Sequence, residues 1–298
     1  MKYYVLYNAL SGHGSAEAVA KEIHTKLDGE VVGLADMTKI TNYAAFLSDK
    51  TDCALVICGG DGTLNRFVND TDGLSLENEI YYCATGSGND FLRDIGGEEG
   101  VPFCVTEYLK DLPFVEVGGK RMRFINGVGY GIDGYCCEEG DKLRAAGEKN
   151  INYTAIAIKG LLLHYKPTNA TVTVDGVSHT YKKVWIAPTM HGRYYGGGMM
   201  PTPDQKRNNG EGELSVLLFH RSGKIKTLMI FPSLFKGEHL KKKKYTEVLC
   251  GKDITVEFDS PAPLQIDGET VVGVMKYRAY GCGVPESVGK EEYELAKE

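Results

Sequence analysis

The stretch Cys58-Gly59-Gly60-Asp61-Gly62-Thr63-Leu64-Asn65 directly follows the apolar run 53–57. An apolar run that ends in glycines is typical of a buried strand whose carboxyl end meets a ligand at the edge of a parallel sheet. The glycines let backbone amides approach phosphate oxygens without obstruction by a Cβ atom, and Thr63 is expected to cap the following helix. Asp61 alone would repel a polyphosphate. Its presence therefore predicts a bridging Mg²⁺, which binds carboxylate and phosphate oxygens.

Strand and helix patterns alternate around this loop through the first third of the chain. A second Gly-rich loop, Thr85-Gly86-Ser87-Gly88-Asn89-Asp90-Phe91, follows the next predicted strand and begins another helix. The predicted strands cover 3–7, 30–34, 53–58 and 81–84, and the predicted helices cover 16–27, 41–47 and a segment from about residue 63. This alternation predicts an α/β domain over residues 1–117, Rossmann-like, with a parallel sheet covered by helices.

The pattern changes to short β segments separated by turns from about residue 118. One helix is predicted at 152–164, and Asp175-Gly176 predicts a hairpin turn. The predicted strands are 122–126, 170–174, 184–188, 214–219, 254–258 and 271–277. Residues 118–298 are therefore expected to form a mainly β, sandwich-like domain. The charged tail 285–298 is open to two interpretations, a frayed end or a helix packed back on the first domain.

Composition limits the function classes. The 298 residues, 42% of them apolar, suffice for two buried cores. The 34 basic and 40 acidic residues leave a net charge of −6, which argues against a nucleic-acid partner. The eight cysteines lack C-x-x-C spacing, and no apolar run approaches the length of a membrane span. We expect reduced thiols and a cytoplasmic protein, with contact to the inner face of a membrane left open.

Further motifs accompany the two Gly-rich loops in the same order along the chain. They are Asn8 to Gly14 (NALSGHG), Asn126 to Asp133 (NGVGYGID), Gly196 to Met199 (GGGM) and Gln265 to Glu269 (QIDGE). Together, over residues 3 to about 280, these segments resemble the diacylglycerol kinase catalytic domain family, especially the soluble bacterial lipid kinases that are similar to sphingosine kinases. The resemblance implies a fold of the NAD-kinase and diacylglycerol-kinase type, ATP on the N-terminal domain, an acceptor between the domains, and a homodimer.

The resemblance also assigns nucleotide and metal contacts. Those for ATP are Asn8, Ser11, Gly12, Gly14, Thr38, Gly59, Gly60, Asp61, Gly62, Thr63, Asn65, Thr85, Ser87, Asn89 and Asp90. Asp61 and Asp90, together with Asp133, would hold the catalytic Mg²⁺ directly or through water. These assignments rest on the family likeness and not on spacing.

Two further acids stand at Asp267 and Glu269. Phosphoryl transfer requires positioning, charge neutralisation and a base for the acceptor hydroxyl. If the segment is extended, both carboxylates face one side. The resemblance implies that Asp267 takes the proton of the lipid hydroxyl and that Glu269 supports the metal. From the residues alone, an Asp-Gly hairpin turn between strands 263–266 and 271–276, as at Asp175-Gly176, is the favoured interpretation of this segment.

The chain departs from the family pattern at two places. Ala9 stands where the family usually has proline, a change expected to leave the loop amides in place. Glu211-Gly212 stands where the family has an Asp-Gly that helps to hold a structural Mg²⁺. Glu211 therefore remains an open candidate for a second metal.

The strongest basic run in this acidic chain is Lys241 to Lys244, with Lys236 and His239 nearby. Such a run is typical either of a solvated face or of a surface that attracts anionic lipids. Lys120 to Arg123 is a weaker candidate of the same kind. The apolar helix at 156–163 is interpreted as core in preference to an acyl-chain contact, and His191 has no metal-ligand spacing and is interpreted as a bystander.

These observations predict an ATP- and Mg²⁺-dependent lipid kinase that phosphorylates a hydroxyl of diacylglycerol or a related lipid and supplies phospholipid metabolism. The acceptor itself stays open among diacylglycerol, monoacylglycerol, sphingoid bases, phosphatidylglycerol and isoprenoid alcohols. One alternative is a soluble-metabolite kinase such as an NAD kinase. Another is a non-catalytic nucleotide- or lipid-binding regulator, although such a protein would be expected to lack a key acid. A dinucleotide oxidoreductase is disfavoured because no G-x-G-x-x-G follows the first strand.

Overall fold

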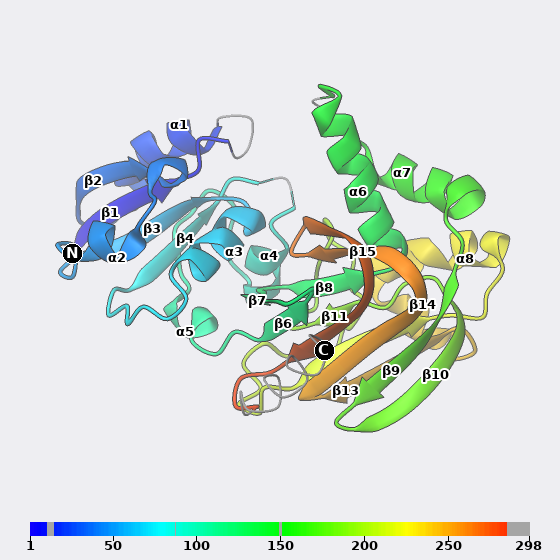
Figure 1. Cartoon of the computed structure of the whole chain (residues 1–298). Helices are drawn as coiled ribbons and strands as arrows, with labels where there is room; N and C mark the ends of the chain where they lie inside the picture. Colours follow the sequence, from blue (N-terminus) through cyan, green and yellow to red (C-terminus); the bar gives the residue numbers. More distant parts are fainter. Residues whose placement is uncertain (11–14, 87, 149–150, 285–298) are drawn as a thin grey trace. The chain divides into compact units, whose positions relative to one another are not determined.

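A computed structural model describes residues 1–10, 15–86, 88–148 and 151–284 of the chain. They divide into two compact units (Figure 1). The first consists of residues 1–110 and the returning segment 194–198, and the second of residues 111–193 and those from Met199 onward. The expected boundary at 117/118 lies too far along the chain, because the strand β6 (Phe114–Val117) pairs with β15 (Glu269–Tyr280) in the second unit.

The first unit contains a five-stranded sheet in the order β2-β1-β3-β4-β5. Its strands are β1 (Lys2–Tyr7), β2 (Glu30–Asp36), β3 (Ala54–Gly59), β4 (Ile80–Ala84) and β5 (Phe103–Cys104). The first four strands are parallel, and β5 joins β4 in the antiparallel sense. The expected parallel sheet is confirmed, with each predicted strand in its predicted place.

Helices pack on both faces of this sheet because alternate residues of a strand point to opposite sides. Ala54, Val56 and Cys58 of β3 pack with Ala20 and Ile23. On the other face, the ring of Tyr82 packs edge-on against Phe91 at 5.9 Å between centroids. The helical elements are α1 (Ser15–Glu22), η2 (Ile23–Lys26), η3 (Met37–Lys39), α2 (Tyr43–Leu47), α3 (Asp61–Asp70), α4 (Asp90–Ile95) and α5 (Thr106–Leu109).

The second unit is an antiparallel β-sandwich, as predicted, with main strand order β13-β12-β11-β8-β14-β15-β6-β7. The long strand β14 (Asp253–Ile266) connects its layers: residues 254–258 pair with β9 (Thr168–Val174), whereas residues 264–266 pair with β8 (Gly127–Tyr130). The register shift between Glu257 and Ala262 marks the bend between these two pairings. The other strands are β7 (Lys120–Arg123), β10 (Val177–Val184), β11 (Thr189–Met190), β12 (Leu214–Phe219) and β13 (Thr246–Gly251).

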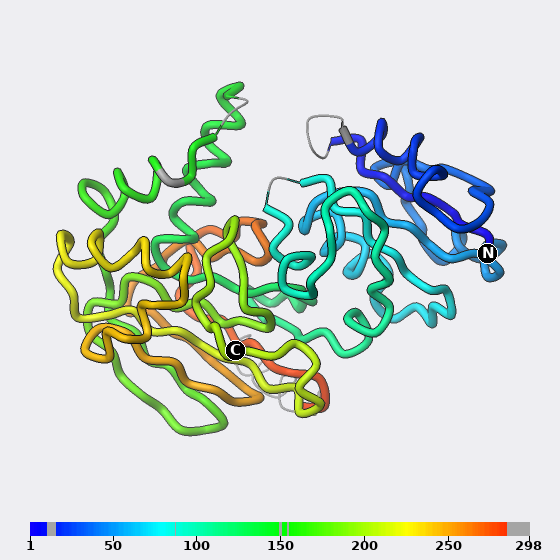
Figure 2. The backbone as a smooth tube through the Cα atoms, turned by 180° about the vertical axis from the view of Figure 1, so that it is seen from behind, coloured from blue at the N-terminus to red at the C-terminus, as the bar shows by residue number. Residues whose placement is uncertain are grey.

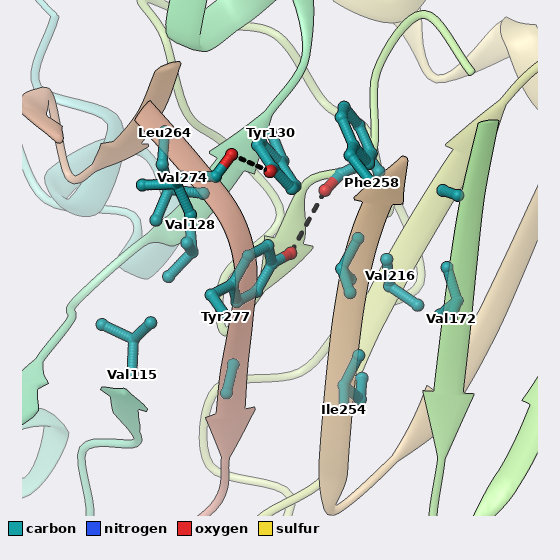
Figure 3. Packing of buried hydrophobic residues seen from close by; sticks show 14 of the residues in the cluster. Val115, Val128, Tyr130, Val172, Val216, Ile254, Phe258, Leu264, Val274 and Tyr277 are labelled. Atoms are coloured by element: carbon teal, nitrogen blue, oxygen red, sulfur yellow. Dashed lines mark hydrogen bonds between the residues drawn. The ribbon is translucent and has the colours of Figure 1, made fainter. Parts of the chain in front are cut away.

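Aromatic rings fill the centre of this sandwich (Figure 3). Tyr130 and Phe258 stack with 3.8 Å between ring centroids, and the Tyr277 ring lies edge-on to Tyr130. The Tyr130 hydroxyl donates to the carbonyl of Val274, and the Tyr277 hydroxyl donates to the carbonyl of Ala187 at 3.2 Å. Both hydroxyls are buried, so these bonds avoid the cost of unpaired polar groups.

More helix is present in the second unit than the sequence predicts. Besides α7 (Tyr153–Lys159), which continues as the π-helical turn η4 (Gly160–His164), the unit contains α6, α8, η5 and η6. Their bounds are α6 (Ile132–Ala145), α8 (Lys224–Ile230), η5 (Phe231–Lys236) and η6 (Glu238–Lys241). The prediction of a single helix was wrong because Gly134 and Gly140 weaken the helical pattern of α6. Packing requires glycine at position 134, since a Cβ there would lie 2.0 Å from the carbonyl oxygen of Pro263, whereas a Cβ at Gly140 would meet the ring of Tyr153.

Candidate active site

The two Gly-rich loops of the first unit lie against each other at the carboxyl end of the parallel sheet. The N–H of Thr85 donates to the carbonyl of Gly59 at 2.8 Å. A Cβ at Gly86 would lie 2.8 Å from Cα of Gly60, so only glycine permits this approach of the two backbones. Helix α3 begins at Asp61 with Gly60 as its N-cap. The expectation that Thr63 caps this helix is wrong, because Thr63 is already its third residue.

Asp61 connects the two loops through its carboxylate. Its Oδ2 accepts the backbone N–H of Asp90 at 2.7 Å and that of Phe91 at 3.3 Å. Its Oδ1 accepts the hydroxyl of Tyr82 at 3.4 Å. The N-cap of α4, Asn89, has a left-handed backbone and makes no side-chain cap, so Asp61 supplies the acceptor that the first turn of α4 requires.

Asp90 is the second carboxylate of this site, and its Oδ2 accepts the N–H of Gly197 from the returning segment at 2.7 Å. Burial raises the pKa of Asp90 to about 6, and the negative charge of Asp61 adds to this shift, although the Gly197 N–H opposes it. Arg93 lies 3.7 Å from Oδ1 and has half of its side chain in solvent. Two acids close together and one elevated pKa are typical of a site that accepts a proton or a cation.

Three buried polar atoms beside these loops have no hydrogen-bond partner within the described chain. They are Thr85 Oγ1, Asn89 Oδ1 and Asp90 Oδ1. Because a buried polar group without a partner is costly, these oxygens on the loop that Asp61 orders fit the oxygen-rich surroundings that Mg²⁺ and phosphate prefer. No cluster of three or more His, Cys, Asp or Glu side chains suited to a metal occurs among the described residues. A metal at Asp61 and Asp90 would therefore also need water or phosphate oxygens.

The first loop is held by side chains from β2 and α3. Asn8 Nδ2 donates to Thr63 Oγ1 at 3.2 Å. Both the N–H and the hydroxyl of Thr38 donate to Asp36 Oδ1, at 3.0 and 2.8 Å, and the N–H of Ala9 reaches the same oxygen at 3.4 Å. Burial favours the protonated form of Asp36, but these bonds prevail and its pKa is lowered. Sequence reasoning missed Asp36, which orders the predicted nucleotide contact Thr38 and the loop residue Ala9.

Three further predicted nucleotide contacts lie at the end of β3 and on α3, namely Gly59, Gly62 and Asn65. Asn65 is buried on α3 and accepts from Asn69 Nδ2 through its backbone carbonyl at 3.0 Å and through Oδ1 at 3.2 Å. Gly62 has open space where a Cβ would lie, unlike Gly59, whose Cβ would meet the Thr63 side chain at 2.5 Å. Ser11, Gly12, Gly14 and Ser87 lie outside the described residues, as does the tail 285–298.

Asp267 lies in the second unit, in a two-residue turn. Asp267 and Gly268 have φ of 47° and 96°, and Ile266 pairs with Glu269 across the hairpin. The expectation of an extended segment with both acids on one side is therefore wrong. The hairpin alternative describes the backbone, with the same left-handed φ of 47° at Asp175. Glu269 is exposed.

The hairpin nevertheless holds the Asp267 carboxylate in a defined place. Oδ1 accepts the N–H groups of Asn126 and Gly127 at 2.8 and 3.0 Å, and Oδ2 accepts the N–H of Ile125. Three backbone donors on one carboxylate form an anion-binding concavity and fix its orientation. This contact connects two of the motifs, Asn126 to Asp133 and Gln265 to Glu269.

Arg207 completes this arrangement, although sequence reasoning did not single it out. Its buried guanidinium donates to the carbonyl of Ile125 and to Asn126 Oδ1. His191 donates its backbone N–H to the carbonyl of Asn126 at 2.9 Å. Burial, together with the positive charge of Arg207, lowers the pKa of His191 well below its usual value. His191 therefore contributes a neutral ring and a backbone bond to this loop.

The remaining predicted metal ligands, Asp133, Glu211 and Glu269, belong to the second unit. Asp133 is buried in the first turn of α6, where its Oδ2 lies 1.7 Å from the position that a Cβ at Gly129 would take. Only glycine at 129 allows this placement. Glu211 is exposed and pairs with Lys252 at 2.7 Å, which lowers the pKa of Glu211. A lysine ammonium beside Glu211 argues against a cation there.

Sequence comparison agrees with this division of the chain. The model of the diacylglycerol kinase catalytic domain matches residues 2–111, and that of the YegS C-terminal NAD kinase beta sandwich-like domain matches residues 126–279. The chain therefore carries a diacylglycerol kinase catalytic domain in its first unit, and over more than half of its length it belongs to the family of the YegS C-terminal NAD kinase beta sandwich-like domain. The resemblance found in the motifs is thereby confirmed, and with it the expected two-part fold.

Proteins named as diacylglycerol kinases are similar to nearly the whole chain. A diacylglycerol kinase of Mycobacterium tuberculosis is 25% identical over 92% of this chain and 94% of its own length. The crystal structure of a diacylglycerol kinase from Bacillus anthracis superposes with a TM-score of 0.60 at 15% identity, over 94% of this chain and 93% of that one. This second likeness concerns the fold alone.

Proposed function

We propose that the protein is an ATP- and Mg²⁺-dependent kinase that transfers the γ-phosphoryl group to a hydroxyl of diacylglycerol or a related lipid. The observation that carries the proposal is a set of three buried oxygens without a hydrogen-bond partner among the described residues, Thr85 Oγ1, Asn89 Oδ1 and Asp90 Oδ1, beside two glycine loops in backbone contact. Such a site suits a phosphate chain and its cation. Membership of a lipid kinase family supplies the class of acceptor.

In this proposal Gly60, Gly62 and Gly86 keep Cβ atoms away from the phosphates. Asp61 and Asp90 hold Mg²⁺, which neutralises phosphate charge when bound. Asp267 accepts the proton of the acceptor hydroxyl as its oxygen attacks the γ-phosphorus, while the bond to the β-phosphate oxygen breaks and ADP leaves. The three amides on Asp267 position this base.

The test is transfer of labelled γ-phosphate from ATP, with and without Mg²⁺, to dispersed diacylglycerol, sphingosine, phosphatidylglycerol and NAD. We expect a labelled lipid only when Mg²⁺ is present. Labelled NADP would instead support a soluble-metabolite kinase. ATP binding without transfer to any acceptor in the panel would contradict the proposed activity and favour a regulatory protein.

Mg²⁺ binding is measured independently by the melting temperature. Millimolar Mg²⁺ is expected to raise the melting temperature of the wild type at pH 7.5, because a ligand that binds only the native state stabilises it. The double variant Asp61→Asn with Asp90→Asn should lose this shift. An equal shift in both proteins would place the cation elsewhere.

A further inference from the structure

Exposed apolar side chains gather on two helical segments of the second unit. The segment 153–166 contains α7 and η4, and the segment 224–244 contains α8, η5 and η6. Ile225 and Met229 stand one turn apart on α8 with 74% and 69% of their surface exposed, and Leu163 of η4 is 67% exposed. Ile158, Leu162 and Phe235 are further exposed apolar residues of these segments. We refer to the outer side of both segments as the α7–α8 surface.

The two segments are neighbours in space although about sixty residues separate them in the chain. Helix α8 packs against η4, and η4 continues α7 without a break. Lys224 Nζ donates to the carbonyl of Leu162 at 2.8 Å, which fixes the start of α8 to η4. Figures 1 and 2 show the green α7 segment beside the yellow α8 segment from opposite directions. The exposed apolar side chains therefore belong to one surface.

The charge of this surface is opposite to that of the whole protein. The two segments contain nine lysines and one glutamate, a net charge of +8, whereas the complete chain carries −6. Lys241 pairs with Glu238, the single acid of the surface, at 2.9 Å. On α6, which packs against α7, the carboxylates of Glu138, Glu139 and Asp141 lie 2.6–3.0 Å from Lys142 or Arg144. These neighbouring acids are thus already paired with cations of their own helix.

We propose that the α7–α8 surface binds the face of an anionic phospholipid bilayer. Exposed aliphatic side chains and lysines on the same two segments match the two layers of such a face, since the apolar groups would enter the acyl boundary and the ammonium groups would contact the headgroup phosphates. Long lysine stems reach the headgroup level while the apolar residues lie deeper. The basic run Lys241 to Lys244 is part of this surface.

Charge argues for a bilayer and against a second copy of the chain as the occupant. In a twofold dimer through this surface, the same patch of both subunits would meet, and each patch carries a net charge of +8. Nucleic acid would match the charge but not the exposed aliphatic side chains of the surface. An anionic bilayer complements both the charge and the apolar side chains. The proposed kinase activity would give the surface a use, but the surface rests on its own observations.

The test is flotation of the full chain with vesicles, without nucleotide or substrate. Vesicles of pure phosphatidylcholine are compared with vesicles that contain phosphatidylglycerol. We expect binding to the anionic vesicles to be at least tenfold stronger and to weaken as salt is raised. Equal binding to both vesicles, or binding to neither, would overturn the proposal whether or not the protein phosphorylates a lipid.

Variants locate the binding on this surface. Ile225→Ser with Met229→Ser should reduce binding to anionic vesicles at least tenfold, and Lys226→Gln with Lys236→Gln should also weaken it. The matched control is Val177→Ser with Val272→Ser, which removes apolar side chains that are 60% and 66% exposed in strands outside the surface. Unchanged melting temperatures would confirm that all variants fold.

Two results would contradict the assignment. If the control variant lost as much binding as the Ile225 and Met229 variant, the surface would not be the binding site. Concentration-dependent dimers that dissociate in the Ile225 and Met229 variant, without vesicle binding by the wild type, would instead make the surface a contact between copies of the chain. A preference for duplex DNA over vesicles would also reject the bilayer.

Discussion

The backbone N–H of Asp90 donates to Oδ2 of Asp61 at 2.7 Å, so that the acid of one Gly-rich loop orders the next. Asp61 therefore has two roles, and the sequence alone does not distinguish between them. It supplies a carboxylate beside the two Gly-rich loops, and it accepts the amides at the start of α4.

Because Asp61 accepts the N–H groups of Asp90 and Phe91, Asp61→Ala is expected to destabilise the protein by about 1.5–3 kcal/mol, since hydrogen bonds to a charged acceptor are lost. Asp61→Asn should cost less, since its amide oxygen still accepts one N–H. Denaturation in urea measures both effects. Asp70→Ala at the exposed end of α3 is the control, and its change should stay within about 1 kcal/mol because the ion pair of Asp70 with Arg66 lies at the surface. Equal effects at residues 61 and 70 would contradict the structural role.

The elevated pKa of Asp90 predicts a pH dependence of stability. With a pKa of about 6 in the native state, above the usual value of 3.8, native Asp90 binds more protons than the unfolded chain between about pH 4 and pH 6. The free energy of unfolding should therefore fall as pH rises through this window, by an amount on the order of 3 kcal/mol. Asp90→Asn should remove this dependence.

Urea denaturation at pH 4, 5, 6 and 7 checks this prediction without nucleotide or metal. The relevant quantity is the difference between wild type and variant, because other groups titrate in both proteins and cancel. The variant should gain stability relative to the wild type as pH rises. If the difference in the free energy of unfolding between wild type and variant is the same at all four pH values, the pKa of Asp90 is not raised in the native state.

Gly62 and Gly59 are expected to respond differently to alanine. At Gly62 a Cβ meets nothing within 4 Å, so Gly62→Ala should leave the protein equally stable or stabilise α3 by up to about 1 kcal/mol. If this amide approaches a phosphate, the same change should weaken ATP binding about tenfold or more. Gly59→Ala would press on the Thr63 side chain and should lower stability. Calorimetric titration with ATP and thermal melting together separate the two effects.

Comparison with Asp175 distinguishes the proposed catalytic role of Asp267 from a purely structural role in its Asp-Gly turn. Both residues have φ of 47° and precede a glycine, and both accept backbone N–H groups, those of Lys252 and Asp253 in the case of Asp175. Asp267→Asn is expected to lower kcat by about 10²–10⁴-fold with unchanged ATP affinity, the range typical of a lost general base. Asp175→Asn should leave kcat within about twofold, because Asp175 has no part in the proposed reaction. Equal losses in both variants would indicate a defect of the fold.

The local pattern of the chain was sufficient to predict the parallel sheet and the glycine loops. Strand β3 is apolar throughout and ends at Gly59, and the period of the residues around it distinguishes strands from helices. The Asp175-Gly176 turn was predicted for the same reason, because left-handed backbone favours these residue types in sequence. The boundary between the units and helix α6 were not predictable in this way. The pairing partner of β6 lies over 150 residues away, and α6 contains glycines that only its packing explains.

Tertiary structure decided how the functional groups are held. The sequence alone determined which acids and glycines exist and that they follow strands, since these properties are local. It did not determine that Asp61 accepts the amides of Asp90 and Phe91, or that Asp267 receives three amides from residues 125–127. It also did not reveal that α7 and α8 form one basic, apolar surface. These contacts join segments distant in the chain, and only the closure of the sheet and the sandwich brings them together.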